Sequence, residues 1–245
     1  MERGELVFNA LVKLNVTFVG TRYHSRGIDD LGHVSNCVET EQIVCLEDGS
    51  STVSSFVQLR GSIPVFWRQN INLRYKPPFE FYNAGLTSTV FARHFDALSS
   101  RYASSKEEES LVTAVNLVNH SGWEGELAKA FSREAASYDP KKLHYIAFDF
   151  NRNCPNMQWS RVNKLLEELS DDLQRQGFFS GQLTNGSMKS KTLQSGVIRT
   201  NCIDCLDRTN LVQSTIARRI LDQQLAGMDS SIFDQLFKLS KTRFH

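Results

Sequence analysis

A short apolar run, a polar loop and an amphipathic run follow one another in Gly196-Val-Ile-Arg-Thr-Asn-Cys-Ile-Asp-Cys-Leu-Asp-Arg-Thr-Asn-Leu-Val-Gln-Ser-Thr-Ile-Ala-Arg-Arg-Ile-Leu-Asp-Gln-Gln-Leu225. Residues 196–199 predict a strand that enters the loop. From Thr209 to Leu225 the apolar residues recur at helical spacing, which predicts a helix. In such a unit the helix N-terminus and the N–H groups of the loop converge on one small volume, which suits an anion.

Cys202 and Arg208 stand at the two ends of that loop, with five residues between them. This spacing lets a loop wrap a phosphate, so that the sulfur lies beneath phosphorus and the guanidinium grips two oxygens. The surrounding N–H groups and Arg208 are expected to lower the pKa of the Cys202 thiol. The loop therefore suggests thiolate attack on phosphorus and a cysteinyl-phosphate that water hydrolyses, with no metal or other cofactor required.

The spacing alone is a weak signal, because a cysteine beside a helix is more often a buried apolar group than a nucleophile. Cys202 and Cys205 also form a Cys-x2-Cys pair, which would suit half a zinc site or a redox pair. No second ligand pair stands at metal spacing, which argues against zinc. A disulfide in which Cys205 traps oxidised Cys202 stays open.

The composition is that of a folded, non-membrane chain. Of 245 residues, 40% are hydrophobic and 10% aromatic, enough for a buried core. Lys and Arg total 28 against 27 Asp and Glu, so the net charge of +1 argues against a nucleic-acid binder. The five cysteines are an odd number and indicate a reducing compartment. No window reaches the roughly 18 apolar residues that span a bilayer, so a soluble or peripheral protein is expected.

Strand and helix patterns alternate along the rest of the chain. Strands are expected over residues 6–20, 34–46, 53–59, 111–118, 145–150 and 196–199. Helices are expected from residue 88, from residue 125, over 157–176 and over 209–225. Residues 64–82 and 180–195 are expected to be loops. This order predicts a single α/β domain, with a mixed sheet flanked by helices and a Cys-x5-Arg phosphate loop between a strand and a helix.

The segment Arg199-Thr-Asn-Cys-Ile-Asp-Cys-Leu-Asp-Arg-Thr-Asn210 closely resembles the signature of the Sac family of phosphoinositide phosphatases, a module also found in the synaptojanins. Similar segments upstream are Gly20-Thr-Arg-Tyr23, Asn36-Cys-Val-Glu-Thr-Glu-Gln42, Ser55-Phe-Val-Gln-Leu-Arg-Gly-Ser-Ile-Pro-Val-Phe-Trp67 and Phe148-Asp-Phe150. The resemblance implies a phosphatase that acts on phosphatidylinositol phosphates in membranes. It also implies a location in the cytoplasm, peripheral on the cytosolic face of internal membranes.

By the same resemblance, Cys202 is the nucleophile and Arg208 the phosphate clamp. Asp204 or Asp207 is the candidate for the acid that protonates the leaving inositol oxygen. An ion pair or a helix cap is an equally good interpretation of Asp207. The residues assigned to substrate binding are Arg199, Asn201, Ile203, Cys205, Leu206 and Thr209. Additional phosphate contacts from Arg22, Arg26 and Arg60 are a weaker hypothesis.

The sequence also departs from the family pattern. Sac modules usually carry a β-rich lobe before the region of Leu6 and a further stretch after the catalytic helix, and Asn151 stands where relatives often have histidine. Residues 1–245 are therefore expected to be an incomplete Sac-type catalytic domain. The alternative is a truncated, non-catalytic remnant that binds phosphoinositide or a protein partner through faces left exposed, for example over residues 232–239.

Overall fold

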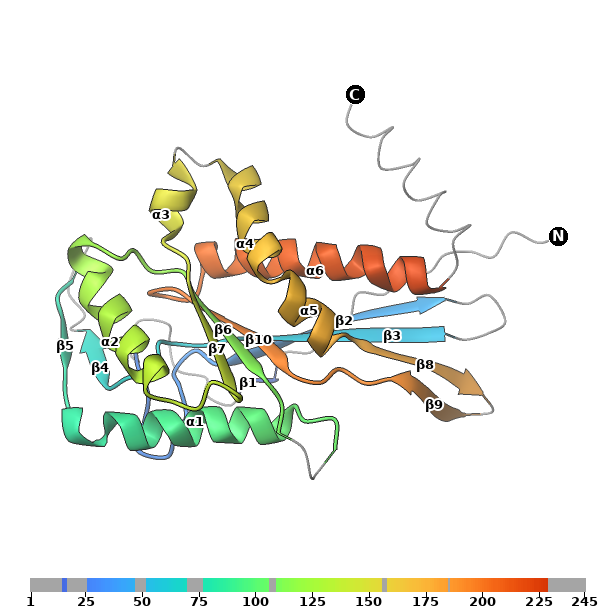
Figure 1. Cartoon of the computed structure of the whole chain (residues 1–245), viewed down its shortest axis with the longest axis horizontal. Helices are drawn as coiled ribbons and strands as arrows, with labels where there is room; N and C mark the ends of the chain where they lie inside the picture. The colour runs from blue at the N-terminus through green and yellow to red at the C-terminus, as the bar shows by residue number, and fades with distance from the viewer. Residues whose placement is uncertain are drawn as a thin grey trace.

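A computed structural model describes residues 15–16, 26–46, 52–69, 77–105, 109–155, 158–184 and 186–228. These residues form three layers, in which a mixed β-sheet lies between two groups of helices (Figure 1). The predicted fold class, a mixed sheet flanked by helices, is confirmed. The expected strand over 6–20, apart from Asn15–Val16, and the segment 232–239 lie outside the described residues.

The main sheet has the order β1-β2-β3-β10-β6-β7, and a hairpin of β8 and β9 is attached through β8 to β3. The strands are β1 Asn15–Val16, β2 Val38–Leu46, β3 Thr52–Arg60, β6 Val112–Asn116, β7 Leu143–Ala147, β8 Phe179–Thr184, β9 Ser187–Thr192 and β10 Val197–Asn201. The central strand β10 runs parallel to both of its neighbours, β3 and β6. The carboxyl ends of these three strands therefore meet at one edge of the sheet, where α/β proteins bind ligands.

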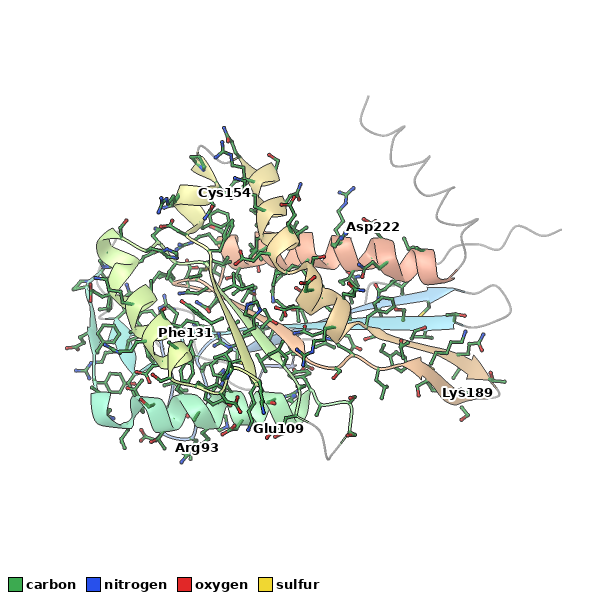
Figure 2. The ribbon with its side chains drawn as sticks, in the orientation of Figure 1. Arg93, Glu109, Phe131, Cys154, Lys189 and Asp222 are labelled. Carbon is green, nitrogen blue, oxygen red and sulfur yellow. The ribbon has the colours of Figure 1, made fainter. Side chains whose placement is uncertain are left out.

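The helices are α1 Thr87–Arg101, α2 Gly125–Ala136, α3 Phe150–Asn153, α4 Asn163–Glu168, α5 Ser170–Gln176 and α6 Asp207–Met228. The apolar sides of α4, α5 and α6 share one core with Ile198 of β10. The opposite core joins α1 and α2 to Val197, and Figure 2 shows Phe131 of α2 in this layer. Because successive side chains of a strand point to opposite faces of the sheet, Val197 and Ile198 of β10 pack into the two different cores.

Residues 180–195 were expected to be a surface loop, which is wrong. They form most of β8 and β9, which pair antiparallel, with β8 continuing the sheet beside β3 (Figure 1). Every side chain of β9 is exposed, including Lys189 at the far end of the molecule in Figure 2. The polar composition therefore reflects exposure of an edge strand and not the absence of one, because strand preference depends on the context of the sheet.

The expected strand over 145–150 is displaced, because β7 runs from Leu143 to Ala147 and α3 begins at Phe150. Asp149 causes the change: its carboxylate accepts the Arg152 N–H at 3.0 Å and caps the helix. The remaining differences are smaller.

The expected helix over 157–176 consists of a 3-10 turn, Trp159–Val162, followed by α4 and α5. The expected loop 64–82 contains a short hairpin of β4 Trp67–Gln69 and β5 Phe79–Phe81.

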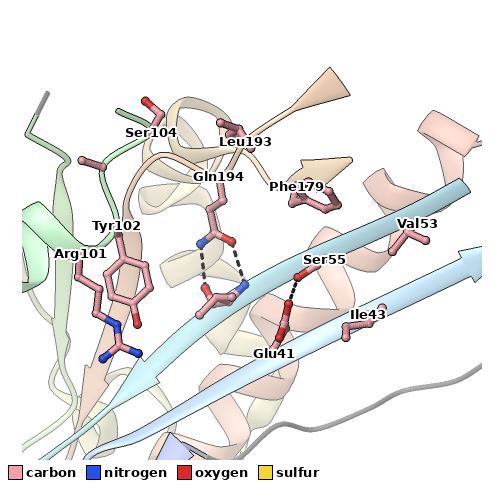
Figure 3. A pocket seen from close by; sticks show the side chains of 12 residues that line it. Glu41, Ile43, Val53, Ser55, Arg101, Tyr102, Ser104, Phe179, Leu193 and Gln194 are labelled. Carbon is pink, nitrogen blue, oxygen red and sulfur yellow. Dashed lines mark hydrogen bonds between the residues drawn. The ribbon is translucent and has the colours of Figure 1, made fainter. Parts of the chain in front are cut away.

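The connection from β9 to β10 is held against the sheet by one side chain. Gln194 accepts the Val57 N–H at 2.8 Å and donates to the Val57 carbonyl at 2.9 Å, so it pairs with β3 as a strand would (Figure 3). A cavity of about 480 Å³ lies beside it, over the face of β2 and β3 that α6 does not cover. Ile43, Val53 and Phe179 give this cavity an apolar lining (Figure 3).

Gly196, directly before β10, has a φ of +111°, in the region that favours glycine. A β-carbon there would overlap the Leu111 carbonyl oxygen and lie 2.9 Å from Cγ of Gln176. We therefore expect Gly196→Ala to lower the free energy of unfolding by about 2 kcal/mol. Urea unfolding measures this, with Gly85→Ala as control because the position has open space around it. Equal losses in the two variants would contradict the argument.

Candidate active site

The segment Cys202–Leu206 connects the end of β10 to the start of α6, at the sheet edge where the parallel strands end. The last residue of β10, Asn201, donates from its side chain to the Asn116 side-chain oxygen at 2.6 Å. Its carbonyl accepts the Leu117 N–H at 2.9 Å. The end of β10 is therefore joined to the end of β6 by backbone and side-chain bonds, which fixes the position from which the loop starts.

The Cys202 sulfur is buried between two polar side chains. It accepts the Thr209 hydroxyl at 3.2 Å and donates to the Asp204 carboxylate at 3.3 Å, and that carboxylate also accepts the Leu206 N–H at 3.0 Å. Burial raises the pKa of the Cys202 thiol, and the charge of Asp204 raises it further. The Thr209 hydroxyl and Arg208 lower it by less. The predicted lowering of the Cys202 pKa is therefore wrong for this structure. The Asp204 carboxylate adjoins the sulfur, and its negative charge disfavours the thiolate.

Arg208, in the first turn of α6, is bound by a carboxylate that the sequence did not reveal. Its Nη1 and Nη2 donate to the two oxygens of Glu124 at 2.8 and 2.7 Å, and Nη1 also donates to the Leu117 carbonyl at 3.1 Å. Glu124 is buried and accepts the Asn119 N–H at 2.7 Å. Burial acts to lower the pKa of Arg208, but the hydrogen bonds and charge of Glu124, with smaller contributions from Cys202 and Asp204, outweigh it and raise this pKa. The only sequence signal for Glu124 was its place shortly after the buried strand over 111–118.

The hydrogen atoms of the Arg208 guanidinium can be counted. Glu124 accepts one hydrogen from Nη1 and one from Nη2, and the Leu117 carbonyl accepts the second Nη1 hydrogen. The Nε–H and the second Nη2–H have no partner among the described residues. These two donors form the side edge of the fork, which matches two oxygens of a phosphate or carboxylate.

A cleft of about 870 Å³ adjoins the loop and is lined in part by Arg208. Of the residues singled out from the loop, only Asp204, Asp207 and Arg208 line it. The rest of its wall comes from Asn119, Ser121, Gly122, Trp123, Glu124, Phe150, Asn151, Cys154, Pro155 and Trp159. The cleft therefore combines one guanidinium, three carboxylates, two side-chain amides and three aromatic side chains, and the wall opposite the loop was not predicted from the sequence.

None of the six residues predicted to bind substrate is among those that line the cleft. Asn201, Ile203, Cys205, Thr209 and Arg199 are buried, and Leu206 is half-buried. The expectation that the Arg199 side chain contacts substrate does not agree with its exposure of 1%.

Cys205 is fixed inside the loop. It has a φ of +57°, unusual for a residue other than glycine, and its thiol donates to the Gly61 carbonyl at 3.0 Å. Burial raises the pKa of this thiol to about 12. A disulfide between Cys205 and Cys202 stays a prediction.

Asp207 is exposed at the start of α6, and its side chain makes no hydrogen bond or ion pair with any other described residue. The ion pair and the side-chain cap considered for it are thus not observed within that part of the chain. Arg60, at the end of β3, donates to Asn210 in the first turn of α6 at 2.6 Å. Arg26 donates to Gln69 at 3.4 Å, and Arg22 lies outside the described residues.

A family model described as the SacI homology domain matches residues 5–155. The chain belongs to the SacI homology domain family. Among its relatives, the phosphoinositide phosphatase SAC6 of Arabidopsis thaliana is 39% identical over 90% of this chain and 37% of its own length. The phosphatidylinositol-3-phosphatase SAC1-A of Danio rerio is 42% identical over 85% and 33%, and SAC1 of Saccharomyces cerevisiae is 36% identical over 91% and 36%.

This SacI homology protein therefore spans about a third of the length of the curated relatives it matches. Within its described residues, no helix has the length and apolarity needed to cross a bilayer. The same part of the chain holds no group of three or more His, Cys, Asp or Glu side chains arranged to bind a metal ion.

Removal of Glu124 tests the ion pair. We expect Glu124→Ala to lower the free energy of unfolding by about 3 kcal/mol, because it leaves a largely buried guanidinium without its counter-ion. Glu126→Ala is the matched control, since Glu126 pairs with Lys129 at 2.8 Å in solvent and should contribute less than about 0.5 kcal/mol. Chemical unfolding of both variants measures the difference. Similar losses would mean that the buried pair has no special weight.

The raised pKa of Cys202 predicts slow alkylation at neutral pH, because only the thiolate reacts. The rate of Cys202 modification by iodoacetamide, followed by mass spectrometry of its peptide, should rise with pH to a midpoint above 9.0, the ordinary value for this group. An unfolded peptide with the same sequence is the reference. A midpoint below about 7 would show that the thiolate is already stabilised in the free protein.

Proposed function

We propose that this SacI homology protein hydrolyses phosphate monoesters on the inositol ring of phosphatidylinositol phosphates, through a cysteinyl-phosphate intermediate. The observation that carries the proposal is the side edge of the Arg208 guanidinium, which has no partner among the described residues, together with the cleft that Arg208 lines next to the loop that holds the Cys202 sulfur. The substrate class is supported by the relatives named phosphoinositide phosphatase and phosphatidylinositol-3-phosphatase.

In the first step the Cys202 thiolate attacks phosphorus, forming the S–P bond while the bond between phosphorus and the inositol oxygen breaks. The Nε and Nη2 donors of Arg208 bind two of the phosphoryl oxygens, and Glu124 keeps the guanidinium in place. In the second step water attacks phosphorus, the S–P bond breaks, and phosphate leaves while the thiolate is regenerated. The Thr209 hydroxyl, 3.2 Å from the sulfur, stabilises the thiolate as it departs.

The leaving inositol oxygen needs a proton, and Asp204 and Asp207 are the two candidates that line the cleft. In an in-line displacement the leaving oxygen lies across phosphorus from the sulfur. Asp204 already bonds the sulfur, whereas Asp207 has no described partner. We therefore favour Asp207 as the donor, and as the group that later takes a proton from the attacking water.

We further propose that the protein acts in the cytoplasm, peripherally on the cytosolic face of internal membranes, because the lipid named for the relatives resides in membranes. We also propose that protein partners bind at exposed apolar side chains, among them Leu183, Met188 and Leu193.

A second candidate function is binding without turnover. It is favoured by the arrangement at Cys202, where the thiol pKa is raised and the Asp204 carboxylate occupies the place beside the sulfur. A loop of this kind would hold a phosphoinositide headgroup through Arg208 and the helix N-terminus while the sulfur stays protonated.

Phosphate release from liposomes that contain each phosphatidylinositol phosphate in turn separates the two functions. We expect the parent chain to release phosphate, Cys202→Ser to release none, and Arg208→Ala to be slower by about a hundredfold or more, because a transition-state donor is lost. Cys45→Ser is the matched control, since Cys45 lies in β2 and does not line the cleft. It should retain full activity.

If the parent sediments with these liposomes but releases no phosphate, and Cys202→Ser binds equally well, the binding function is correct and the hydrolytic one is wrong. If phosphotyrosine peptides are hydrolysed and the lipids are not, the substrate class is wrong although the loop chemistry stands.

A further inference from the structure

Arg199 is a buried cation close to the loop, and no carboxylate of the described residues is bound to it. Arg199, in β10, donates to the Ser62 carbonyl at 2.6 Å, to the Asn201 side chain at 3.3 Å and to His94 at 3.2 Å. Its guanidinium also lies 5.9 Å from the centre of the Phe95 ring. All of these partners are neutral, including His94, whose pKa is lowered. Burial of an ion without a counter-ion is costly.

His94 is the acceptor that makes this burial possible without a carboxylate. Its Nδ1 donates to the Gly32 carbonyl at 2.9 Å, which leaves Nε2 as the acceptor for the Nε–H of Arg199. Burial, followed by the charge of Arg199, lowers the pKa of His94 to about 3, so the ring is neutral at physiological pH. Burial lowers the pKa of Arg199 only to about 10, so the guanidinium stays charged. The pair therefore carries a net positive charge.

The contacts of Arg199 lead to the loop on two sides. Asn201 precedes Cys202 and ties β10 to Asn116 of β6. Ser62 follows Gly61, whose carbonyl accepts the Cys205 thiol at 3.0 Å and whose N–H donates to the Thr200 carbonyl at 3.3 Å. One guanidinium thus joins the strand that enters the loop to the turn on which the middle of the loop is held.

The charges nearest the sulfur leave an anion in the loop poorly balanced. Arg208 is already paired with Glu124, and the Asp204 carboxylate adjoins the sulfur. A thiolate or a phosphoryl group would add further negative charge. The charge of Arg199 reaches the loop, because it acts to lower the pKa of the buried Cys205 thiol there, against the larger effect of burial. A buried charge is screened little by solvent.

We propose that Arg199 is a positioning residue of the loop, whose unpaired buried charge stabilises the anion bound there, first the Cys202 thiolate and then the phosphoryl group. The inference rests on the proposed phosphatase function. The titratable groups that face Arg199 are His94 from α1, Cys37 before β2 and Cys205 in the loop. None of them is a carboxylate.

Orthovanadate, an analogue of phosphate in its five-coordinate state, is the probe, and the fluorescence of Trp123 and Trp159 in the cleft reports its binding. We expect Arg199→Met to weaken vanadate binding by at least about tenfold and Arg199→Lys, which keeps the charge, by less than about threefold. Arg218→Met, on the exposed side of α6, removes a surface charge and should leave the affinity unchanged. A folded Arg199→Met variant that binds vanadate like the parent would overturn the proposal.

The pH profile of Cys202 alkylation separates charge from packing. Arg199→Met should move its midpoint upward by about one pH unit, which is a tenfold slower reaction at neutral pH, while Arg199→Lys stays near the parent. A purely structural role would leave this midpoint unchanged, and that result would refute the charge effect. If the parent binds no vanadate, the proposed function fails, and the alkylation profile still decides the role of Arg199.

Should Arg199→Met fail to fold, substitutions of its acceptor give the answer. His94→Gln keeps an acceptor for the Arg199 Nε–H and should bind vanadate like the parent. His94→Leu leaves that donor unsatisfied and should weaken binding by about fivefold, on the order of 1 kcal/mol in affinity. Equal vanadate affinity in the two variants would contradict the positioning role.

Discussion

The parallel pairing of β10 with β3 on one side and β6 on the other is the constraint on which the site depends. It brings three chain segments to one edge, each of which continues past its strand into the site. Gly61 follows β3 and accepts the Cys205 thiol, while Leu117 follows β6 and accepts Arg208. The loop after β10 is therefore held by backbone carbonyls of its two neighbours, and its shape is set by the sheet more than by its own sequence.

The parts of the fold that follow from local pattern were predictable from sequence. The strand at 197–201 and the helix that begins near Asp207 agree with the periodicity, because both bury a regular apolar face. Strand β9 was missed because all its side chains are in solvent, so no apolar alternation marks it. The early end of β7 was missed because it depends on one helix cap, Asp149. A cap can be predicted from sequence only when the helix that follows is long enough to show helical periodicity, and α3 is too short for that.

The candidate site divides in the same way. Cys202, Asp204, Asp207 and Arg208 lie within seven residues of one another; the first and last were found by their spacing, and the two aspartates by the family resemblance. Glu124 lies 84 positions from Arg208, and His94 lies 105 positions from Arg199. Pairing over such separations is created by the sheet and has no periodic signal. The expected thiol pKa was wrong for the same reason, since burial and the orientation of Asp204 are tertiary properties.

The position of β10 in the sheet also has a consequence for how the chain acquires its structure. Among the described strands β10 comes last in sequence, yet it lies at the centre of the main sheet. During synthesis β3 and β6 are complete long before residue 201 is made, but they have no common neighbour until β10 enters between them. Their inner edges and both apolar cores stay open during that interval, which is the period when unpaired strands favour aggregation and chaperone binding.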